Sequence, residues 1–248
     1  MKRLAILLFS AALLLSAGST VSAASTEAGI EHSGANIGDT ASLQRGAKWY
    51  VNYCMGCHSL SYMRYNRLAA DLELSEDLVM QNLVFSNAKF ADTMDIAMDP
   101  EQAKSWFGKT PPDLSLIGRS RGADWLYSYL LGFYQDGNGE WNNTLLPNAS
   151  MPHVLWSLQG IQTPVYRQET SADGFTHAVI DHFELTRPGT QSPQEFEETA
   201  RDIAAFLEYA GEPAKLKRKG IGVWVILFLV LFTFVAYLLK AEYWRDVH

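Results

Sequence analysis

The sequence predicts a mainly α-helical head followed by a single C-terminal transmembrane helix. Apolar side chains recur at a spacing of four residues from Leu43 to Cys54, which is the pattern of one helical face. Ser192-Pro193-Gln194-Glu195 is a capping box with proline at the first helical position, and it opens a second helix. The stretch 221–239 is apolar and carries no charge, so it has the composition of a membrane span.

The N-terminal residues have the pattern of an export signal. A basic start is followed by an apolar run over 4–17 and by the small-x-small site Val21-Ser22-Ala23. Because the apolar run is short for a membrane span, we expect a signal peptide over 1–23 that is removed. Residues 24–38 are small and polar, and they predict a flexible arm ahead of the head, which covers 39–213.

The first helix of the head begins at Asp39 or Thr40 and delivers the stretch Cys54-Met55-Gly56-Cys57-His58 at its end. Two thiols at this spacing followed by histidine form a c-type haem attachment motif. Each thiol bonds one vinyl group of the haem, which places His58 under the iron as its proximal ligand. A thioredoxin-like redox pair is the alternative, but it would need a βαβ setting. The chain has only these two cysteines, so no Cys-rich zinc site is expected.

The middle of the chain predicts short helices, turns and one hairpin. We expect a short helix over 71–86, a mixed polar stretch over 89–107 that Pro100 breaks, and an aromatic-rich helix over 123–133. The start of 110–115 cannot be helical because it contains Pro111 and Pro112. The remaining expectations are turns over 132–148, strands over 165–168 and 177–186 in one hairpin, and a last head helix from the capping box to about Ala210.

The apolar stretch 221–239 is about 28 Å long as a helix, against about 30 Å of bilayer hydrocarbon. It follows a basic juxtamembrane linker over 214–220 and precedes a tail over 240–248. The positive-inside rule would keep the basic linker in the cytoplasm, but long exported domains cross regardless of charge. We therefore expect the tail in the cytoplasm and the head outside it. The linker would meet acidic lipid or a partner subunit, or be solvated.

The formal net charge of −7 argues against nucleic acid and favours basic partners. Acidic residues crowd after the haem motif and again over 92–101, where they are either a docking surface for a basic protein or a solvated face. The sequence shows no Gly-rich phosphate loop and no nucleophile–base pair. We expect an electron carrier without catalytic residues of its own, in which the haem supplies the chemistry.

We expect the sixth ligand of the iron to be a methionine, because a soft thioether favours reduced iron. Met151 precedes Pro152, which favours an extended backbone and presents the side chain from a loop. Met94 and Met98 remain conceivable, whereas Met55 and Met63 are too near the motif and Met80 lies in a helical pattern. His153 is the main rival, and a bis-histidine site would lower the redox potential.

Four further features narrow the class of c-type cytochrome. They are Pro-Pro-Asp-Leu-Ser at 111–115, Arg119-Ser-Arg121, Met151-Pro152 and the single C-terminal anchor. Together with the haem motif they resemble the cytochrome c1 family, the haem subunits of the quinol–cytochrome c reductase (bc1) complex. The resemblance covers about 38–213 and the anchor. It implies a c-type cytochrome head with long loop insertions and a small β-hairpin, one covalent haem c, and Met151 as the second axial ligand.

The resemblance also implies roles for neighbouring residues. The Pro112 region supplies a backbone carbonyl that accepts a hydrogen bond from His58, which fixes the ring. Arg119 or Arg121 pairs with the haem propionates, with Arg121 the better candidate; surface charge is the alternative for both.

The implied function is transfer of one electron from an iron–sulfur subunit to a c-type cytochrome, in a complex with cytochrome b at the bacterial inner membrane, with the head in the periplasm. An independent membrane-anchored cytochrome c that donates to a terminal oxidase is the alternative. A haem peroxidase or nitrite-type reductase subunit would need an open sixth position. A protein that carries haem only to fold is a further alternative, in which Met151 would be dispensable.

Overall fold

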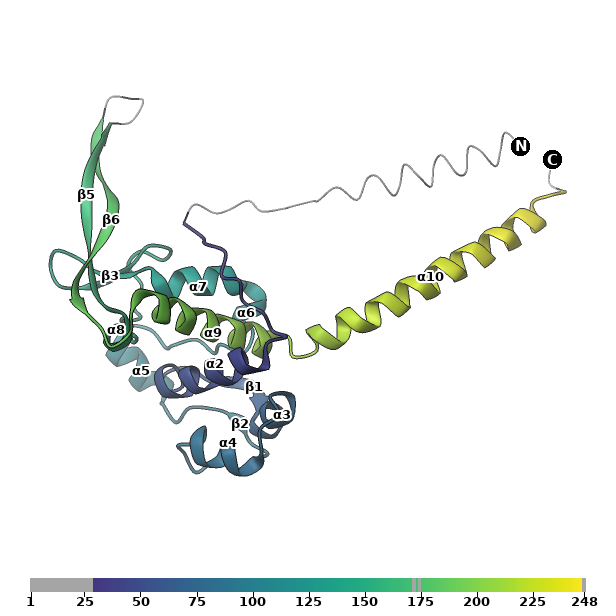
Figure 1. Cartoon of the computed structure of the whole chain (residues 1–248), viewed down its shortest axis with the longest axis horizontal. Helices are drawn as coiled ribbons and strands as arrows, with labels where there is room; N and C mark the ends of the chain where they lie inside the picture. The colour runs from purple at the N-terminus through teal and green to yellow at the C-terminus, as the bar shows by residue number, and fades with distance from the viewer. Residues whose placement is uncertain (1–28, 171–172, 174, 247–248) are drawn as a thin grey trace. The chain divides into compact units, whose positions relative to one another are not determined.

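The computed structural model describes residues 29–170, 173 and 175–246 (Figure 1). Within these residues the helices are Thr40–Tyr53 (α2), Tyr65–Asp71 (α3), Glu76–Asn82 (α4), Pro100–Phe107 (α5), Ile117–Ser120 (α6), Ala123–Leu131 (α7), Trp156–Gln159 (α8), Pro193–Gly211 (α9) and Lys215–Tyr243 (α10). The strands form antiparallel pairs, Leu60–Arg64 (β1) with Thr93–Met94 (β2), Phe133–Gln135 (β3) with Trp141–Asn143 (β4), and Gly160–Thr170 (β5) with Thr176–Pro188 (β6). The predicted signal peptide, 1–23, and the arm up to residue 28 lie outside the described residues.

The two long head helices begin where their sequence signals predict. Asp39 caps α2, because its carboxylate accepts a hydrogen bond from the Ser42 N–H at 3.1 Å. Ser192 and Glu195 form the reciprocal capping box of α9, which runs one residue past the predicted end. These local signals therefore fix both N-termini without help from the rest of the fold.

The core forms where α2 crosses α9, and Gly46 lies at the closest approach. A Cβ atom at Gly46 would come within 2.1 Å of the Asp202 carbonyl oxygen and 2.7 Å of the Phe206 Cβ. One helical turn after Gly46, the Tyr50 ring packs against Phe206 with centroids 5.6 Å apart. The missing side chain of glycine is what allows the two backbones to pack this closely.

A buried carboxylate ties the same two helices together. The Asp202 side chain is 6 % exposed, and it accepts hydrogen bonds from Ser42 Oγ at 2.6 Å and from Arg45 Nε at 2.6 Å. Arg45 Nη2 adds a bond of 2.9 Å to the other carboxylate oxygen. Both carboxylate oxygens have hydrogen-bond partners, which offsets the cost of burying the charge. The bonds therefore fix the position of α2 relative to α9.

The helices α6 and α7 cover another side of α9. A Cβ atom at Gly118 would lie 2.3 Å from the Leu207 carbonyl oxygen, so α6 also relies on a glycine for its close approach. On α7, the Tyr127 ring lies under the Arg201 guanidinium of α9, 6.0 Å from ring centroid to carbon. α9 is therefore the central element that α2, α6 and α7 share.

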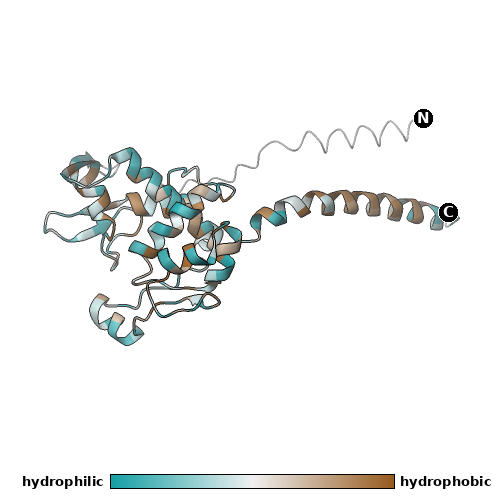
Figure 2. Ribbon diagram, turned by 60° about the horizontal axis from the view of Figure 1, so that its bottom comes forward, coloured by the Kyte–Doolittle hydropathy of each residue, from teal (hydrophilic) through white to brown (hydrophobic). Residues whose placement is uncertain are grey.

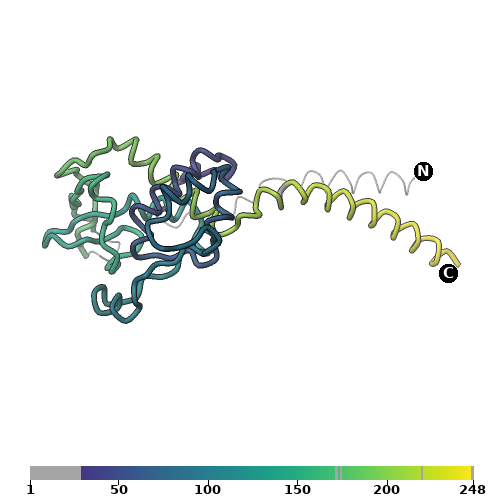
Figure 3. The backbone as a smooth tube through the Cα atoms, turned by 90° about the horizontal axis from the view of Figure 1, so that it is seen from below, coloured from purple at the N-terminus to yellow at the C-terminus, as the bar shows by residue number. Residues whose placement is uncertain are grey.

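The structure has helix α3, which ends at Asp71, and then α4, which confirms the short helix predicted within 71–86. Glu73 adopts a left-handed backbone with φ 57°, which ends the first helix. Ser75 then caps the second by accepting a hydrogen bond from the Leu78 N–H at 3.2 Å. Figure 3, seen from below, shows the blue segment that carries both helices in front of the rest of the head.

The expectation that Pro100 interrupts the 89–107 stretch is wrong, because Pro100 is the first residue of α5. Asp99 caps this helix and accepts from the N–H groups of Glu101 at 3.0 Å and Gln102 at 2.9 Å. Proline costs nothing at the first helical position, where its missing N–H would have no intrahelical partner. The same residue type that breaks a helix interior therefore starts one here.

Residues 31–38, the second half of the predicted flexible arm, are held against the head. The Ser33 N–H and Oγ both donate to the Asp124 carboxylate, at 2.8 and 2.6 Å, and His32 Nδ1 lies 3.1 Å from its other oxygen. Arg201 Nε donates to the Ser33 carbonyl at 2.7 Å. A small polar composition predicted flexibility, but these bonds anchor the segment to α7 and α9.

We expect this anchoring to weaken at low pH. Burial alone would raise the pKa of Asp124, but the hydrogen bonds from Ser33 and the contact with His32 outweigh it and lower that pKa. The folded-state pKa therefore lies below the unfolded value of about 3.9, so the contact is fully present above that pH and is lost as pH falls through the lower folded-state value. The measurement is amide hydrogen-exchange protection at Ser33 as a function of pH.

The matched variants are Asp124→Asn and, on the exposed start of α4, Asp77→Asn. Asp124→Asn replaces charged hydrogen bonds by neutral ones, so we expect protection at Ser33 at neutral pH to fall roughly fivefold and its acid-induced loss to disappear. Asp77→Asn should leave both unchanged. Acid-induced loss that persisted in Asp124→Asn would assign the effect to another group.

The predicted hairpin is confirmed, and it is longer than the sequence pattern indicates. β5 and β6 pair over their full lengths with two register shifts. At the base, Gln162 Nε2 donates to the Phe133 carbonyl at 2.6 Å, and the rings of Tyr134 and Phe183 lie 5.3 Å apart. These contacts fix the hairpin to β3, next to the end of α7.

The C-terminal helix α10 is long and apolar enough to cross a membrane. Figure 2 shows it as hydrophobic along most of its length, and its apolar side chains are exposed. The helix already begins at Lys215, so the predicted basic linker is continuous with it. Lys215 pairs with Glu208, and Arg218 Nε lies 2.8 Å from Glu212 Oε1, so two of the basic residues bind the acidic end of α9.

Candidate functional site

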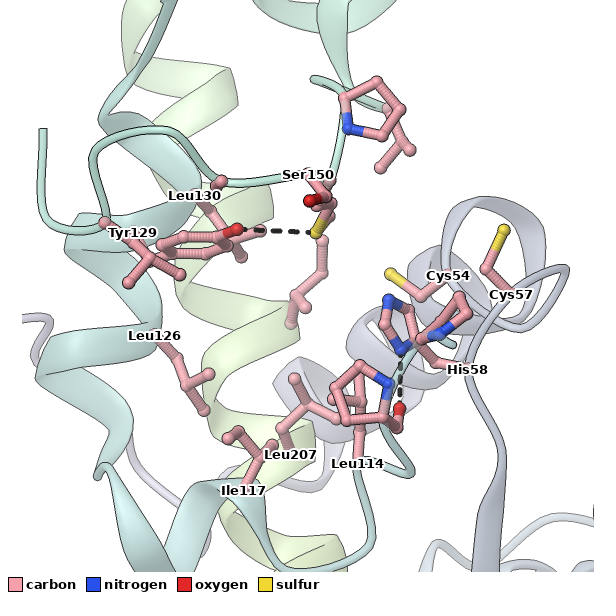
Figure 4. Close-up of a pocket in the computed structure, with 18 of the residues that line it drawn as sticks. Cys54, Cys57, His58, Leu114, Ile117, Leu126, Tyr129, Leu130, Ser150 and Leu207 are labelled. Carbon is pink, nitrogen blue, oxygen red and sulfur yellow. Dashed lines mark hydrogen bonds between the residues drawn. The ribbon is translucent and has the colours of Figure 1, made fainter. Parts of the chain in front are cut away.

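A largely apolar cavity of about 350 Å³ lies inside the head. Its walls come from the end of α2 and the turn that follows it, the 107–117 segment, α7, the loop 146–154, and the α9 residues Ile203 and Leu207. Figure 4 shows Cys54, Cys57 and His58 on one side of this space and Tyr129, Leu130 and Ser150 on the other. The site is therefore built from segments that are far apart in the sequence.

The two cysteines line the cavity at the C-terminal end of α2. Cys54 is the C-cap of the helix, and a turn follows in which the N–H groups of Cys57 and His58 both donate to the Cys54 carbonyl, at 3.0 and 2.9 Å. Neither thiol is in a disulfide. Burial raises the pKa of the Cys54 thiol to about 12, whereas a dithiol redox motif needs a lowered pKa. The thioredoxin-like alternative therefore loses its physical basis.

The His58 ring is held by the proline turn. Its Nδ1 donates to the Pro112 carbonyl oxygen at 2.7 Å. Burial lowers the pKa of His58, although the bond to Pro112 and the charge of Asp113 oppose that shift, so the ring is neutral near pH 7. With the proton on Nδ1, the lone pair of Nε2 is free to bind a metal.

The proline turn is itself fixed to the chain that follows the haem motif. The Asp113 carboxylate accepts from the Ser61 N–H at 2.9 Å and from the Ser115 N–H at 2.8 Å. The Leu114 N–H donates to the Ser59 carbonyl at 2.9 Å. The carbonyl that orients His58 is therefore part of a rigid unit and not of a free loop.

Met151 also lines the cavity, from the loop 146–154. Its sulfur accepts a hydrogen bond from the Tyr129 hydroxyl at 3.6 Å, drawn as a dashed line from the labelled Tyr129 in Figure 4. The neighbouring Ser150 and Pro152 also line the cavity. An imidazole and a thioether thus face the same apolar space from different segments.

The rival ligands lie elsewhere. Met63 and Met94 are buried in the core, and among the methionines that the structure describes only Met151 lines the cavity. His153 is 2 % exposed and stacks on the Phe133 ring with centroids 5.0 Å apart. Burial lowers the pKa of His153 to about 4. The histidine is therefore a neutral member of an aromatic cluster behind the loop.

The two candidate arginines are placed differently. Arg121 lines the cavity, and its guanidinium lies 5.1 Å from the centroid of the Trp125 ring. Arg119 does not line the cavity, and its guanidinium lies 4.0 Å from Glu212 at the end of α9. Of the two, Arg121 alone is in a position to reach an anionic group bound at the cavity.

Several residues of the site were not singled out from the sequence. Trp125 and Tyr129 line the cavity one helical turn apart on α7, and their rings are stacked 5.0 Å apart. The aromatic content of 123–133 was visible, but not which of its faces would meet the site. The buried Asn143 carries no sequence signal at all, since asparagine is common in exposed turns.

Comparisons with known proteins place the chain in a family. The model of the Cytochrome C1 family matches residues 34–247. The chain belongs to the cytochrome c1 family. It is 49 % identical over 221 residues to cytochrome c1 of Allochromatium vinosum, covering 88 % of this chain and 90 % of that one.

Other relatives carry two kinds of name. The chain is 42 % identical over 212 residues to the ammonia monooxygenase gamma subunit of Nitrosomonas europaea, covering 85 % of each chain. It is 28 % identical over 241 residues to cytochrome c1 of Rhodospirillum rubrum, covering 84 % of this chain and 83 % of that one. As a member of the cytochrome c1 family, the chain is a haem-containing electron-transfer subunit of the bc1 complex with one covalently bound haem c.

The cavity suits that cofactor. Its wall is apolar, as a porphyrin ring requires, and it presents the two thiols of the attachment motif together with a neutral imidazole. A guanidinium at the wall offers a partner for propionate groups. The donor set of nitrogen and thioether sulfur is one that haem iron accepts.

Proposed function

We propose that this member of the cytochrome c1 family passes one electron from the iron–sulfur subunit of its complex to a c-type cytochrome. Haem c would be bound through Cys54 and Cys57, with His58 and Met151 as axial ligands. The observation that carries the proposal is that His58 and Met151 face one apolar cavity that both cysteines also line. When bound, the haem supplies one-electron chemistry, and the chain sets its potential and access.

Each proposed residue has a defined task. His58 keeps one ring orientation because the Pro112 carbonyl accepts a hydrogen bond from its Nδ1–H group. Met151 offers a soft sulfur, which favours the reduced iron and raises the potential. Arg121 would neutralise propionate charge at the cavity wall. Leu126, Leu130 and Ile203 exclude water, which strengthens all of these interactions.

We also propose that the two acidic clusters, after the haem motif and over 92–101, receive a basic c-type cytochrome. Their exposed carboxylates are Glu73, Glu76, Asp77, Asp92, Asp95, Asp99 and Glu101. Exposed charges of one sign raise the rate of association with a partner of opposite charge, and high salt screens this effect. The head would lie in the periplasm, with α10 crossing the inner membrane once.

The test is purification of the full-length tagged chain in mild detergent, followed by rapid mixing with a quinol. We expect cytochrome b and an iron–sulfur protein to accompany the chain. Haem c should be reduced by quinol and then reoxidised by added c-type cytochrome, more slowly at high salt. A chain that purified alone and delivered electrons directly to a terminal oxidase would instead be an independent anchored cytochrome. Ready binding of cyanide by the ferric form would indicate an open sixth position.

A further inference from the structure

Tyr129 is held at the cavity wall with its hydroxyl aimed at the candidate sixth ligand. Its ring is stacked on Trp125 at 5.0 Å with planes 9° apart, and it meets the edge of Phe133 at 5.0 Å. The side chain is almost fully buried. Rings clamped on two sides have little rotational freedom, so the hydroxyl is presented to the Met151 sulfur at 3.6 Å in one defined place (Figure 4).

The loop that carries Met151 is tied to the same residue. Asn143 is completely buried, and its Nδ2 donates to the Tyr129 carbonyl at 2.8 Å. Its Oδ1 accepts from the N–H groups of Leu145 at 2.9 Å and Leu146 at 3.3 Å. The backbone of Tyr129 therefore anchors the start of the loop, while its side chain contacts Met151 near the other end.

We propose that Tyr129 is a positioning residue for the sixth ligand of the iron, acting through the hydrogen bond from its hydroxyl to the sulfur of Met151. The inference rests on the proposed role of Met151. Methionine has flexible torsions and no preferred place in a cavity, so a fixed donor selects one position of the sulfur. Thioether sulfur has two lone pairs; the hydroxyl engages one and the other is left for the metal.

The hydrogen bond also has an electronic effect. A donor withdraws electron density from sulfur, so Met151 becomes a weaker electron donor to iron. Oxidised iron, with the higher charge, loses more from this than reduced iron does, so the bond raises the redox potential. Tyr129 would thus both hold the ligand in place and favour the reduced state.

The test compares Tyr129→Phe with the matched control Tyr127→Phe in the purified full-length complex. Both variants remove one hydroxyl from a buried tyrosine of α7, but Tyr127 does not line the cavity. In Tyr129→Phe we expect a weaker red absorption band of the ferric sulfur–iron bond and a lower midpoint potential. Cyanide, which enters only when the sulfur leaves, should bind roughly two- to tenfold faster, the factor carried by one hydrogen bond. Tyr127→Phe should match the parent in all three.

The outcomes separate this inference from the proposed function. If Met151→Leu abolishes the red band but Tyr129→Phe leaves band, potential and cyanide rate at the parent values, only the role of Tyr129 is overturned. If Met151→Leu leaves the red band intact, Met151 is not the ligand and both proposals fail. Loss of covalent haem from Tyr129→Phe would also overturn the inference, because the residue would then serve folding.

Discussion

Replacement of Met151 by leucine is expected to stop quinol-driven electron transfer through the haem while the head stays folded. Leucine fills a similar volume and adds no strain, but it offers no lone pair to the iron. The potential should fall, because the ligand that favours reduced iron is gone. A fall of about 120 mV would shift the equilibrium with the electron donor on the order of a hundredfold against reduction.

The measurement is a redox titration together with the rate of cytochrome c reduction by the complex. Met98→Leu is the matched control, since Met98 is half-buried and does not line the cavity. It should keep the parent potential and rate. If the potential fell in Met98→Leu and kept its parent value in Met151→Leu, Met98 and not Met151 would be the sixth ligand.

Replacement of Gly46 by alanine is expected to destabilise the head by at least about 3 kcal/mol. The added methyl group would meet the Asp202 carbonyl oxygen at 2.1 Å and the Phe206 Cβ at 2.7 Å. Neither atom is at the flexible end of a side chain, so α2 and α9 would have to move apart. This would also strain the bonds between Arg45 and Asp202. Domains are stable by only about 5–15 kcal/mol, so much of the protein should fail to accumulate.

Haem-stained protein in membranes and the thermal unfolding midpoint measure this effect. Gly137→Ala is the control, because a Cβ atom at Gly137 has no neighbour within 4 Å. That variant should behave as the parent does. Equal thermal midpoints for the two variants would mean that the crossing of α2 and α9 adapts at little cost.

The parts of this fold that the sequence predicted are those with a local physical cause. The caps at Asp39 and Ser192 and the non-helical start of 110–115 all depend on neighbours within about four residues. The apolar stretch that becomes the core of α10 depends only on its own composition. Such features need no knowledge of what packs against them, and they were predicted with correct positions.

The features that could not be predicted from the sequence depend on distant residues or on a balance of local signals. Arg119 and Arg121 differ by two positions, and only the packing of α6 on α9 decides which of them meets the cavity. The helix start at Pro100 depends on the capping residue Asp99, whose use cannot be read from periodicity alone. The link from Tyr129 to Met151 joins segments 22 residues apart, and no local rule connects them.

The site also bears on how the mature protein is made. Its walls combine segments from Tyr53 to Leu207, so a porphyrin bound there would fill the space between these segments. Taking it out would leave a void whose cost, at 24 cal/mol per Å³, is on the order of 8 kcal/mol, comparable to the whole stability of a domain. Cys54 is only 7 % exposed once the head has closed. If haem is attached at Cys54 as proposed, we expect the thioether bonds to be made on an open polypeptide, before tertiary folding buries this thiol.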